Sequence, residues 1–320
     1  MKAPVLYIVI PCYNEEEALP ITSEKLIALT DDMMKRNLID VKSRVTLVDD
    51  GSRDRTWQVI SDLCKRDKRF EGVKLAHNRG HQNALLAGLL TAVNDADMIV
   101  SMDADLQDDI NAVDEMVDDY HKGYDVVYGV RSKRETDTFF KRFTAEGFYK
   151  VMKALGVDIV FNHADYRLMS RRAVEGLAQF TEVNLFLRGI VPQIGYKWTT
   201  VTYERAERFA GESKYPLKKM IAFAADGITS FSVKPIRLVF STGVVVFIVS
   251  LIMLIYALVA KLAGHTSVGW TSLMGSIWLI GGIQLLGLGV VGEYIGKIYN
   301  ETKRRPRFII ESVLNKADNE

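Results

Sequence analysis

Hydrophobic and polar residues follow two alternating rhythms between residues 1 and 212. Short β-branched runs, typical of buried strands, are separated by longer segments with helical spacing. The predicted strands are 6–10, 45–48, 73–75, 98–102 and 125–129, and the predicted helices are 16–35, 56–65, 82–92 and 111–122. This alternation predicts βαβ units, and therefore an α/β domain with a mostly parallel sheet covered by helices on both faces.

Two long uncharged runs break this rhythm near the C-terminus. Residues 238–260 and 270–292 each contain no Asp, Glu, Lys or Arg over 23 consecutive positions. A helix of that length reaches about 35 Å, enough to cross a hydrocarbon core about 30 Å thick. The runs therefore predict a two-helix transmembrane hairpin. Two buried helices of a soluble domain are the alternative.

Basic residues flank the predicted hairpin on its outer sides. Lys234 and Arg237 precede it, and Lys297, Lys303, Arg304, Arg305 and Arg307 follow it, whereas the connection between the runs holds only Lys261 and His265. Because positive charge is enriched on the cytoplasmic side, both termini are expected there, with the protein a multi-pass component of the inner or plasma membrane. The run 6–10 leads directly into Pro11 and polar residues, so it predicts a strand and not a secretory signal.

Composition excludes several classes of protein. The chain has 41 Lys and Arg against 40 Asp and Glu, so no global basic excess marks a nucleic-acid binder. Two cysteines, Cys12 and Cys64, are too few for a disulfide framework or a cysteine-rich zinc site, which fits a reducing compartment.

Acidic residues gather after the fourth predicted strand, in the segment Asp103-Ala104-Asp105-Leu106-Gln107. If the chain stays extended there, Asp103, Asp105 and Gln107 point to the same side. Three hard oxygen ligands suit Mg²⁺ or Mn²⁺ bound to phosphate. The alternative is a solvated acidic face, and we assign to it Asp108, Asp109, Asp114, Glu115, Asp118 and Asp119.

A second acidic segment, VDDGSRDRT, follows the second predicted strand at residues 48–56. Asp50 lies at the strand edge and is the better candidate for a ligand group. Asp54 or Ser52 precedes a predicted helix and is expected to cap it. His77, His81 and His163 have no zinc-like spacing and are expected to be ordinary surface or hydrogen-bonded histidines.

Four segments in order make a specific combination: PCYNE at 11–15, VDDGSRDRT at 48–56, DADLQ at 103–107 and ERFAGESKY at 207–215, and the segment ADYRLMSR at 164–171 extends the resemblance that they carry. With them the chain resembles the family 2 glycosyltransferases of the GT-A (Rossmann-like) fold. Within that family it is similar to polyprenyl-phosphate glycosyltransferases, such as bactoprenol glucosyltransferases and dolichol-phosphate mannose synthases. The resemblance covers essentially the whole chain.

The resemblance implies roles for individual residues. Pro11, Tyr13, Glu15 and Asp50 correspond to the nucleotide pocket, and Asp103, Asp105 and Gln107 to the shell of metal and donor phosphate. Asp103 and Asp165 are the implied catalytic residues, with Asp165 either a base or a positioning group. Arg208, Ser213 and Lys214 match a loop that closes over the diphosphate, and Arg131 and Arg142 match an acceptor-phosphate site. Arg79 and Glu146 depart from the family pattern, and Glu146 puts the role of Arg142 in question.

The implied reaction is transfer of one sugar, with inversion, from a nucleotide sugar to undecaprenyl or another polyprenyl phosphate. UDP-glucose is the favoured donor, with UDP-N-acetylglucosamine its nearest rival and GDP-mannose another option. A divalent Mg²⁺ or Mn²⁺ is the implied cofactor, and a homo-oligomer, with a tetramer as one form, the implied assembly. A processive polysaccharide synthase would need more helices and a QxxRW motif. A non-enzymatic lipid-sugar flippase or scaffold would need only the hairpin.

Together these features predict four regions. A GT-A catalytic domain spans 1–212, an interfacial segment 213–237, the hairpin 238–292 and a cytoplasmic tail 293–320. Two basic amphipathic helices are expected at 139–155 and 216–231. The second, which leads into the hairpin, is expected to lie on the membrane surface, whereas packing on protein is an equal alternative for the first.

Overall fold

The structure is a computed structural model that describes residues 3–132, 163–183, 185–204, 234–262 and 269–315. It divides into two compact units. One comprises residues 1–149, 158–216 and 305–320, and the other comprises 150–157 and 217–304. The first unit is the α/β domain and the second contains the helical hairpin.

The first part of the α/β domain follows the predicted alternation. Its elements are β1 (Leu6–Cys12), α1 (Ala18–Lys35), β2 (Arg44–Asp49), α2 (Thr56–Arg66), β3 (Phe70–Leu75), α3 (His81–Ala92), β4 (Met98–Ser101), α4 (Ala112–His121) and β5 (Val126–Arg131). Each predicted strand and helix is confirmed, with ends that differ by a few residues. Further elements that the hydrophobic pattern did not predict are β6 (His163–Ser170), α6 (Arg171–Ala178), α7 (Leu187–Gln193), β7 (Trp198–Tyr203) and β8 (Ile310–Leu314).

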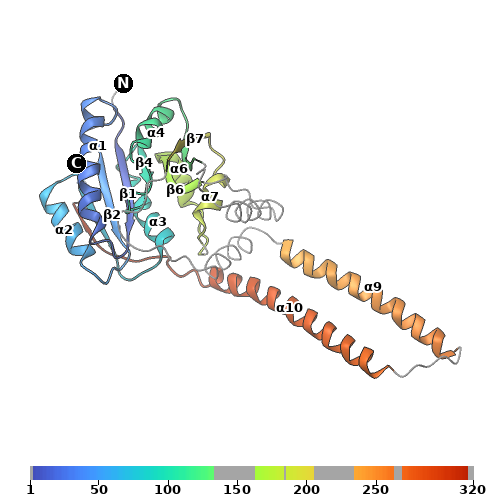
Figure 1. Ribbon diagram of the computed structural model, residues 1–320. Helices are drawn as coiled ribbons and strands as arrows, with labels where there is room; N and C mark the ends of the chain where they lie inside the picture. Colours follow the sequence, from blue (N-terminus) through green and yellow to red (C-terminus); the bar gives the residue numbers. More distant parts are fainter. Residues whose placement is uncertain (1–2, 133–162, 184, 205–233, 263–268, 316–320) are drawn as a thin grey trace. The chain divides into compact units, whose positions relative to one another are not determined.

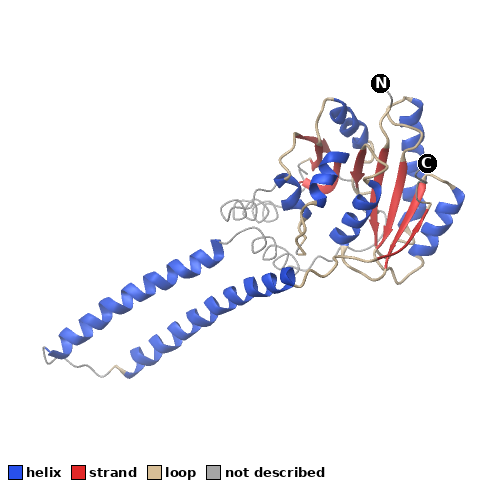
Figure 2. Ribbon diagram, turned by 180° about the vertical axis from the view of Figure 1, so that it is seen from behind, coloured by secondary structure: helices blue, strands red, loops and turns tan. Residues whose placement is uncertain are grey.

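The described strands form one eight-stranded sheet in the order β7-β5-β6-β4-β1-β2-β3-β8. Strands β1 to β4 are parallel, and β5 pairs in parallel with β7. Strand β6 runs antiparallel to both β4 and β5, and β8 runs antiparallel to β3. Figures 1 and 2 show this sheet with helices on either side of it. The expected GT-A architecture, a mostly parallel Rossmann-like sheet, is therefore confirmed.

The two faces of β1 are covered by different helices. Its side chains at Leu6, Ile8 and Ile10 belong to the core shared with α1, α2 and α4. On the other face α3 lies so close that a Cβ placed on Gly88 would be 2.4 Å from Cγ1 of Val9 and 2.7 Å from Cγ2 of Val48. Glycine is needed there because no larger residue fits between helix and sheet. The N-terminus of α3 is thereby fixed against the central strands.

Strand β8 joins the sheet from the far end of the sequence. It pairs with the edge strand β3, where Lys74 forms an ion pair with Glu311 at 2.9 Å. The side chain of Asn315 donates hydrogen bonds to the carbonyl oxygens of Phe70 and Cys64. The region 293–320 was expected to be a tail. Residues 310–314 instead complete the sheet of the α/β domain.

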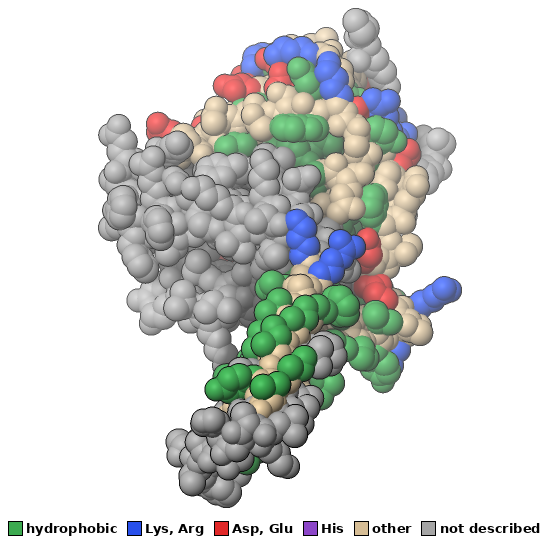
Figure 3. All heavy atoms as spheres, turned by 90° about the vertical axis from the view of Figure 1, so that its right-hand side faces the viewer, with side chains coloured by type: hydrophobic (Ala, Val, Ile, Leu, Met, Phe, Trp, Pro, Cys, Tyr) green, Lys and Arg blue, Asp and Glu red, His purple; other side chains and the backbone are tan. Residues whose placement is uncertain are grey.

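The second unit contains two long apolar helices, α9 (Lys234–Leu262) and α10 (Trp270–Thr302), at the positions of the two uncharged runs. Helix α10 continues ten residues beyond the predicted end at 292. Large hydrophobic side chains lie exposed along both helices, as Figure 3 shows, and they include Leu238, Phe240, Ile255, Leu279, Leu285, Leu286 and Leu288. Among the described residues, one helical segment, Leu279–Thr302, is long and apolar enough to cross a membrane, with a mean hydropathy of 1.5.

Candidate active site

Asp103 and Asp165 come together because β4 and β6 are antiparallel neighbours. Ser101, the last residue of β4, pairs with Arg167 of β6, so Asp103, which follows the end of β4, and Asp165, which precedes Arg167, lie at the same end of this strand pair. The hydroxyl of Ser101 also donates a hydrogen bond of 2.6 Å to the backbone carbonyl of Asp165. The first residues of β6 therefore lie at the carboxyl end of the parallel strands, the edge at which α/β sheets bind ligands.

His81 joins these two carboxylates from a third element. It is the first residue of α3, and its Nε2 lies 3.6 Å from Oδ1 of Asp103 and 3.8 Å from Oδ2 of Asp165. His81 is an exposed histidine, as expected, but it also lies beside both acids, because helix α3 begins at the edge of the sheet where they lie. Its position after the glycine of the third-strand loop was the available signal.

Two arginines hold the carboxylate of Asp165, and the sequence pattern singled out neither. Arg188, in the first turn of α7, donates from Nε and Nη2 to the two carboxylate oxygens at 3.3 and 3.1 Å. Arg167 donates from Nη2 to Oδ1 at 2.5 Å. Burial alone would raise the pKa of the Asp165 carboxyl, but Arg188 and Arg167 hold that pKa well below its usual range. Asp165 is therefore a firmly ionised carboxylate.

Asp103 has the opposite electrostatic surroundings. Burial raises the pKa of its carboxyl, His81 opposes that rise, and the negative charges of Asp108, Asp165 and Asp105 add to it. Negative charge is thus concentrated at this edge of the sheet. A bound cation would offset this repulsion, and carboxylate oxygens are the ligands that Mg²⁺ and Mn²⁺ prefer. Asp103 and Asp105 therefore fit a divalent ion by charge and donor type.

The segment 103–107 is not extended, contrary to the expectation. Strand β4 ends at Ser101, residues 104–105 form a turn, and Leu106 has a positive φ of 52°. Oδ1 of Asp105 accepts the backbone N–H of Gln107 at 3.2 Å, and Thr22 of α1 donates to the carbonyl of Ala104 at 2.8 Å. Within the described ranges, no group of three or more His, Cys, Asp or Glu side chains forms a metal-binding cluster. Any ion held by Asp103 and Asp105 would need further ligands, for which phosphate oxygens are suitable.

The loop after β2, which is expected to bind the nucleotide, is joined to the loop after β3 by the side chain of Asp50. Asp50 is buried, and its two oxygens accept the N–H groups of Arg79 at 2.6 Å and Gly80 at 2.8 Å. Gly51 has a φ of 64°, and a Cβ there would be 2.6 Å from the backbone nitrogen of Asn78. The loops after β2 and β3 therefore form one rigid unit that leads into α3. Asp50 organises this unit, a role that the sequence did not predict.

The segment after β1 packs on the start of α2. Pro11 is buried within β1, whereas 41% of Tyr13 is exposed at the edge of the sheet. The backbone N–H of Glu15 donates to the hydroxyl of Thr56 at 2.8 Å. Asp54 accepts the N–H of Thr56, the first residue of α2, at 3.0 Å. Asp54 thus bonds the start of the helix, as expected, although the N-cap residue itself is Arg55.

Arg131, at the end of β5, lies in a buried polar cluster with Asp108 and Tyr203. Its Nη2 is 3.3 Å from Oδ1 of Asp108, and its Nε donates to the hydroxyl of Tyr203 at 3.3 Å. That hydroxyl donates in turn to Oδ1 of Asp108 at 2.5 Å. Asp108 is only 3% exposed, so its assignment to a solvated acidic face is wrong. Arg131 and Tyr203, distant in sequence, supply the partners that make this burial tolerable.

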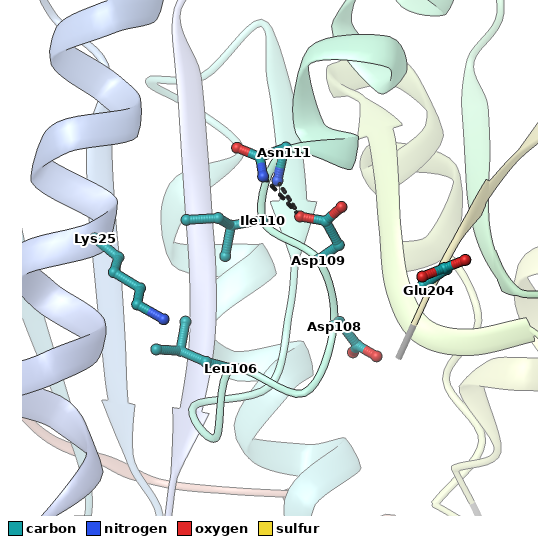
Figure 4. Close-up of a pocket in the computed structure, with 7 residues that line it drawn as sticks. All are labelled: Lys25, Leu106, Asp108, Asp109, Ile110, Asn111 and Glu204. Carbon is teal, nitrogen blue, oxygen red and sulfur yellow. Dashed lines mark hydrogen bonds between the residues drawn. The ribbon is translucent and has the colours of Figure 1, made fainter. Parts of the chain in front are cut away.

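A cavity of about 450 Å³ is lined in part by Asp108 and the residues that follow it. Figure 4 shows Asp109 turned toward Asn111, which donates to it from its backbone and side chain at 3.0 and 2.9 Å. Lys25 reaches the cavity from α1. The lining residues are Lys25, Leu106, Asp108, Asp109, Ile110, Asn111 and Glu204.

Several predicted residues lie outside the described residues. These are Arg142 and Glu146, the loop residues Arg208, Ser213 and Lys214, and both predicted amphipathic helices, 139–155 and 216–231. Their roles stay predictions.

Comparison with known proteins gives consistent matches over both parts of the chain. The model of glycosyl transferase family 2 matches residues 7–177, and the model of the GtrB C-terminal hairpin matches residues 234–298. An uncharacterized glycosyltransferase of Bacillus subtilis (strain 168), YkoT, is 54% identical over 96% of this chain and 91% of its own. A prophage bactoprenol glucosyl transferase homolog of Escherichia coli (strain K12) is 40% identical over 96% of this chain and 98% of its own. The bactoprenol glucosyl transferase of Shigella phage SfV is 38% identical, with coverages of 97% and 99%.

Proposed function

The chain belongs to glycosyl transferase family 2, and on that premise we propose that it transfers one sugar from a nucleoside diphosphate donor to the phosphate of a polyprenyl lipid. UDP-glucose and undecaprenyl phosphate are the first candidates for donor and acceptor. The observation that carries the proposal is the juxtaposition of Asp103 and Asp165 at the carboxyl edge of the sheet, in a chain that also has an apolar two-helix hairpin. Relatives of nearly the same length are named bactoprenol glucosyl transferases, which supports this pair of substrates.

The donor diphosphate would bind beside Asp103 and Asp105. These carboxylates, with Gln107, would hold a Mg²⁺ or Mn²⁺ ion, which when bound supplies positive charge for the leaving nucleotide diphosphate. The linked loops after β1, β2 and β3 would bind the nucleoside. Tyr13 and Glu15 would lie on one side of it, and Asp50 would hold the loops after β2 and β3 in place. Lys214 and Arg208 would close over the diphosphate.

The acceptor needs little help from a base. A phosphate monoester has a second pKa of about 6, so it is largely a dianion at neutral pH and is already nucleophilic. Asp165 is firmly ionised by two arginines, and its conjugate acid is correspondingly strong, which makes it a poor proton acceptor. We therefore assign Asp165 a positioning role. Arg131 and Arg142 would bind the acceptor phosphate, and attack opposite the leaving group would invert the anomeric carbon.

The hairpin would bring this chemistry to the lipid. Its exposed hydrophobic side chains suit a hydrocarbon environment, and the basic residues at both of its ends suit anionic headgroups. The proposed topology is a multi-pass plasma-membrane protein with the catalytic domain and both termini in the cytoplasm, where nucleotide sugars are available. The polyprenyl phosphate would then be loaded from the same side.

A donor screen with full-length protein tests the proposal. The protein, in vesicles that contain undecaprenyl phosphate and Mn²⁺ or Mg²⁺, is given radiolabelled UDP-glucose, UDP-N-acetylglucosamine or GDP-mannose, and label is counted in the lipid extract. We expect lipid-linked label from UDP-glucose that chelation of the metal abolishes. Asp105→Asn should lose it, whereas Asp118→Asn, on the exposed face of α4, should retain it. Absence of lipid-linked label from all three donors would refute the proposed function.

A further inference from the structure

We propose that Arg167 is a positioning residue of the transfer reaction, which acts from within the sheet through the carboxylate of Asp165. The inference rests on the proposed function. It concerns a buried residue whose side chain donates a hydrogen bond to Asp165.

The geometry places Arg167 directly behind Asp165. The two residues are two positions apart on β6 and therefore on the same face of the strand. Arg167 is 1% exposed, and its Nη2 donates to Oδ1 of Asp165 at 2.5 Å. Arg188 of α7 reaches the same carboxylate from outside, and Nε2 of His81 lies 3.8 Å from it. The carboxylate is thus enclosed by side chains from three elements.

The environment of Arg167 is a poor one for a group that serves stability alone. Its Nε and Nη1 are buried and have no hydrogen-bond acceptor among the residues that the structure describes. Burying unsatisfied donors on a charged group is unfavourable, and a well-packed apolar side chain of similar size is often at least as stable in such a place. Costly groups of this kind gather at functional sites. The side chain of Arg167 does donate a hydrogen bond to Asp165, and this bond identifies the site that Arg167 serves.

The consequence is a fixed direction for the Asp165 carboxylate. With Oδ1 shared by Arg167 and Arg188, Oδ2 is turned toward His81 and the second nitrogen of Arg188. Gln82, next to His81, accepts the backbone N–H of Leu187, next to Arg188, at 2.8 Å, so the first turns of α3 and α7 are tied together. Removing Arg167 would leave the carboxylate held by Arg188 alone, through the longer hydrogen bonds of 3.1 and 3.3 Å, and so less firmly fixed in direction.

A double-mutant cycle in full-length protein tests the inference, with labelled transfer from UDP-glucose to undecaprenyl phosphate as the assay. The variants are Arg167→Met, Asp165→Asn and the two combined. The matched control is Arg172→Met, which removes the arginine of another pair, with Asp125, at the opposite end of β6. Arg167→Lys keeps the charge and tests for rescue. Thermal unfolding is measured for each variant. Arg167→Gln replaces the Met variant if the latter does not fold.

We expect Arg167→Met to lower kcat about tenfold or more, as loss of a supporting partner commonly does, with the KM for donor little changed. Arg167→Lys should recover part of that loss, and Arg172→Met should leave kcat intact. In the Asp165→Asn background, the Arg167 substitution should change kcat by less than about twofold, because the negative charge that Arg167 holds in place is already absent. Equal losses for Lys and Met, or losses that multiply in the double variant, would overturn the inference while the active wild type preserves the proposed function. A wild type that transfers no sugar would refute both.

Discussion

Replacing Tyr203 by Phe removes one hydroxyl from the buried cluster around Arg131. The hydroxyl donates to Asp108 at 2.5 Å and accepts from Arg131 at 3.3 Å. The Phe ring keeps the edge-to-face contact with Tyr166, whose ring centroid is 5.2 Å away, so packing is preserved. A hydrogen bond to a charged group contributes about 1.5–3 kcal/mol. Because the other oxygen of Asp108 has no hydrogen-bond partner within the described residues, we place the loss near 2 kcal/mol, on the order of that range.

Thermal unfolding of the full-length protein in detergent measures this loss. For a domain of this size, about 2 kcal/mol corresponds to a fall in Tm of roughly 4–8 °C. Tyr196→Phe is the matched control, because Tyr196 is 38% exposed and its hydroxyl makes no hydrogen bond to any described residue. That control should change stability by less than about 0.5 kcal/mol. Tyr203→Phe should also raise the KM for polyprenyl phosphate more than that for the donor, since Arg131 is the expected acceptor ligand.

Equal Tm values for the two tyrosine variants would refute the reasoning, because the cluster would then contribute no measurable hydrogen-bond energy. A lower Tm with an unchanged acceptor KM would keep the structural role of Tyr203 but separate Arg131 from the acceptor.

Three further predictions follow from other parts of the domain. Gly88→Ala should lower Tm, because overpacking against Val9 and Val48 costs about 1–3 kcal/mol and outweighs the roughly 1 kcal/mol gain in helix propensity. Gly282→Ala should not lower Tm, because a Cβ at that position would have no atom within 4 Å. Equal shifts in Tm for the two variants would contradict the close approach of α3 to the sheet. The side-chain hydrogen bond from Arg172 lowers the pKa of Asp125. The ionised Asp125 therefore stabilises the fold above its unfolded pKa of about 3.9, and this stabilisation is lost as pH falls through the lower folded pKa. Asp125→Asn should reduce the fall in the free energy of unfolding between about pH 6 and about pH 2, and an unchanged fall would contradict this. Deletion of residues 308–320 should expose the edge of β3 and lower Tm, whereas deletion of 316–320, which keeps β8, should have little effect; equal Tm values would show that β8 adds nothing to the sheet.

The elements from β1 to β5 could be predicted because each has a recognisable hydrophobic pattern within its own segment. Their hydrophobic runs are short and β-branched, and the segments between them are longer and have helical spacing. Strand β6 lacks this signal, since HADYRLMS contains a buried arginine and an acid that belong to the candidate site. Strand β8 can be recognised only from its pairing with β3, which would otherwise be the edge strand of the sheet. Pairings between distant segments are not encoded in local periodicity.

The candidate site divides in the same way. Asp103, Asp105 and Asp165 stand in segments that a motif or a resemblance can identify. Arg167 lies in the same segment as Asp165, but nothing in the sequence shows that it is buried and bonded to that acid. His81 and Arg188 are distant in sequence, and the starts of α3 and α7 bring them to Asp165. Asp108 was misassigned for a related reason. Its neighbours in sequence are acidic, and its partners in space, Arg131 and Tyr203, are far along the chain.

The chemical structure of the lipid product tests the central claim most directly. Full-length protein is incubated with UDP-glucose and undecaprenyl phosphate, and the purified lipid is analysed by mass spectrometry and by proton and phosphorus NMR. The account predicts one hexose joined through its anomeric carbon to the lipid phosphate, in the β configuration that inversion of the α-linked donor produces. A product with the α configuration would contradict inversion, and glucose that appears only as free sugar, with the polyprenyl phosphate unchanged, would contradict the proposed function itself.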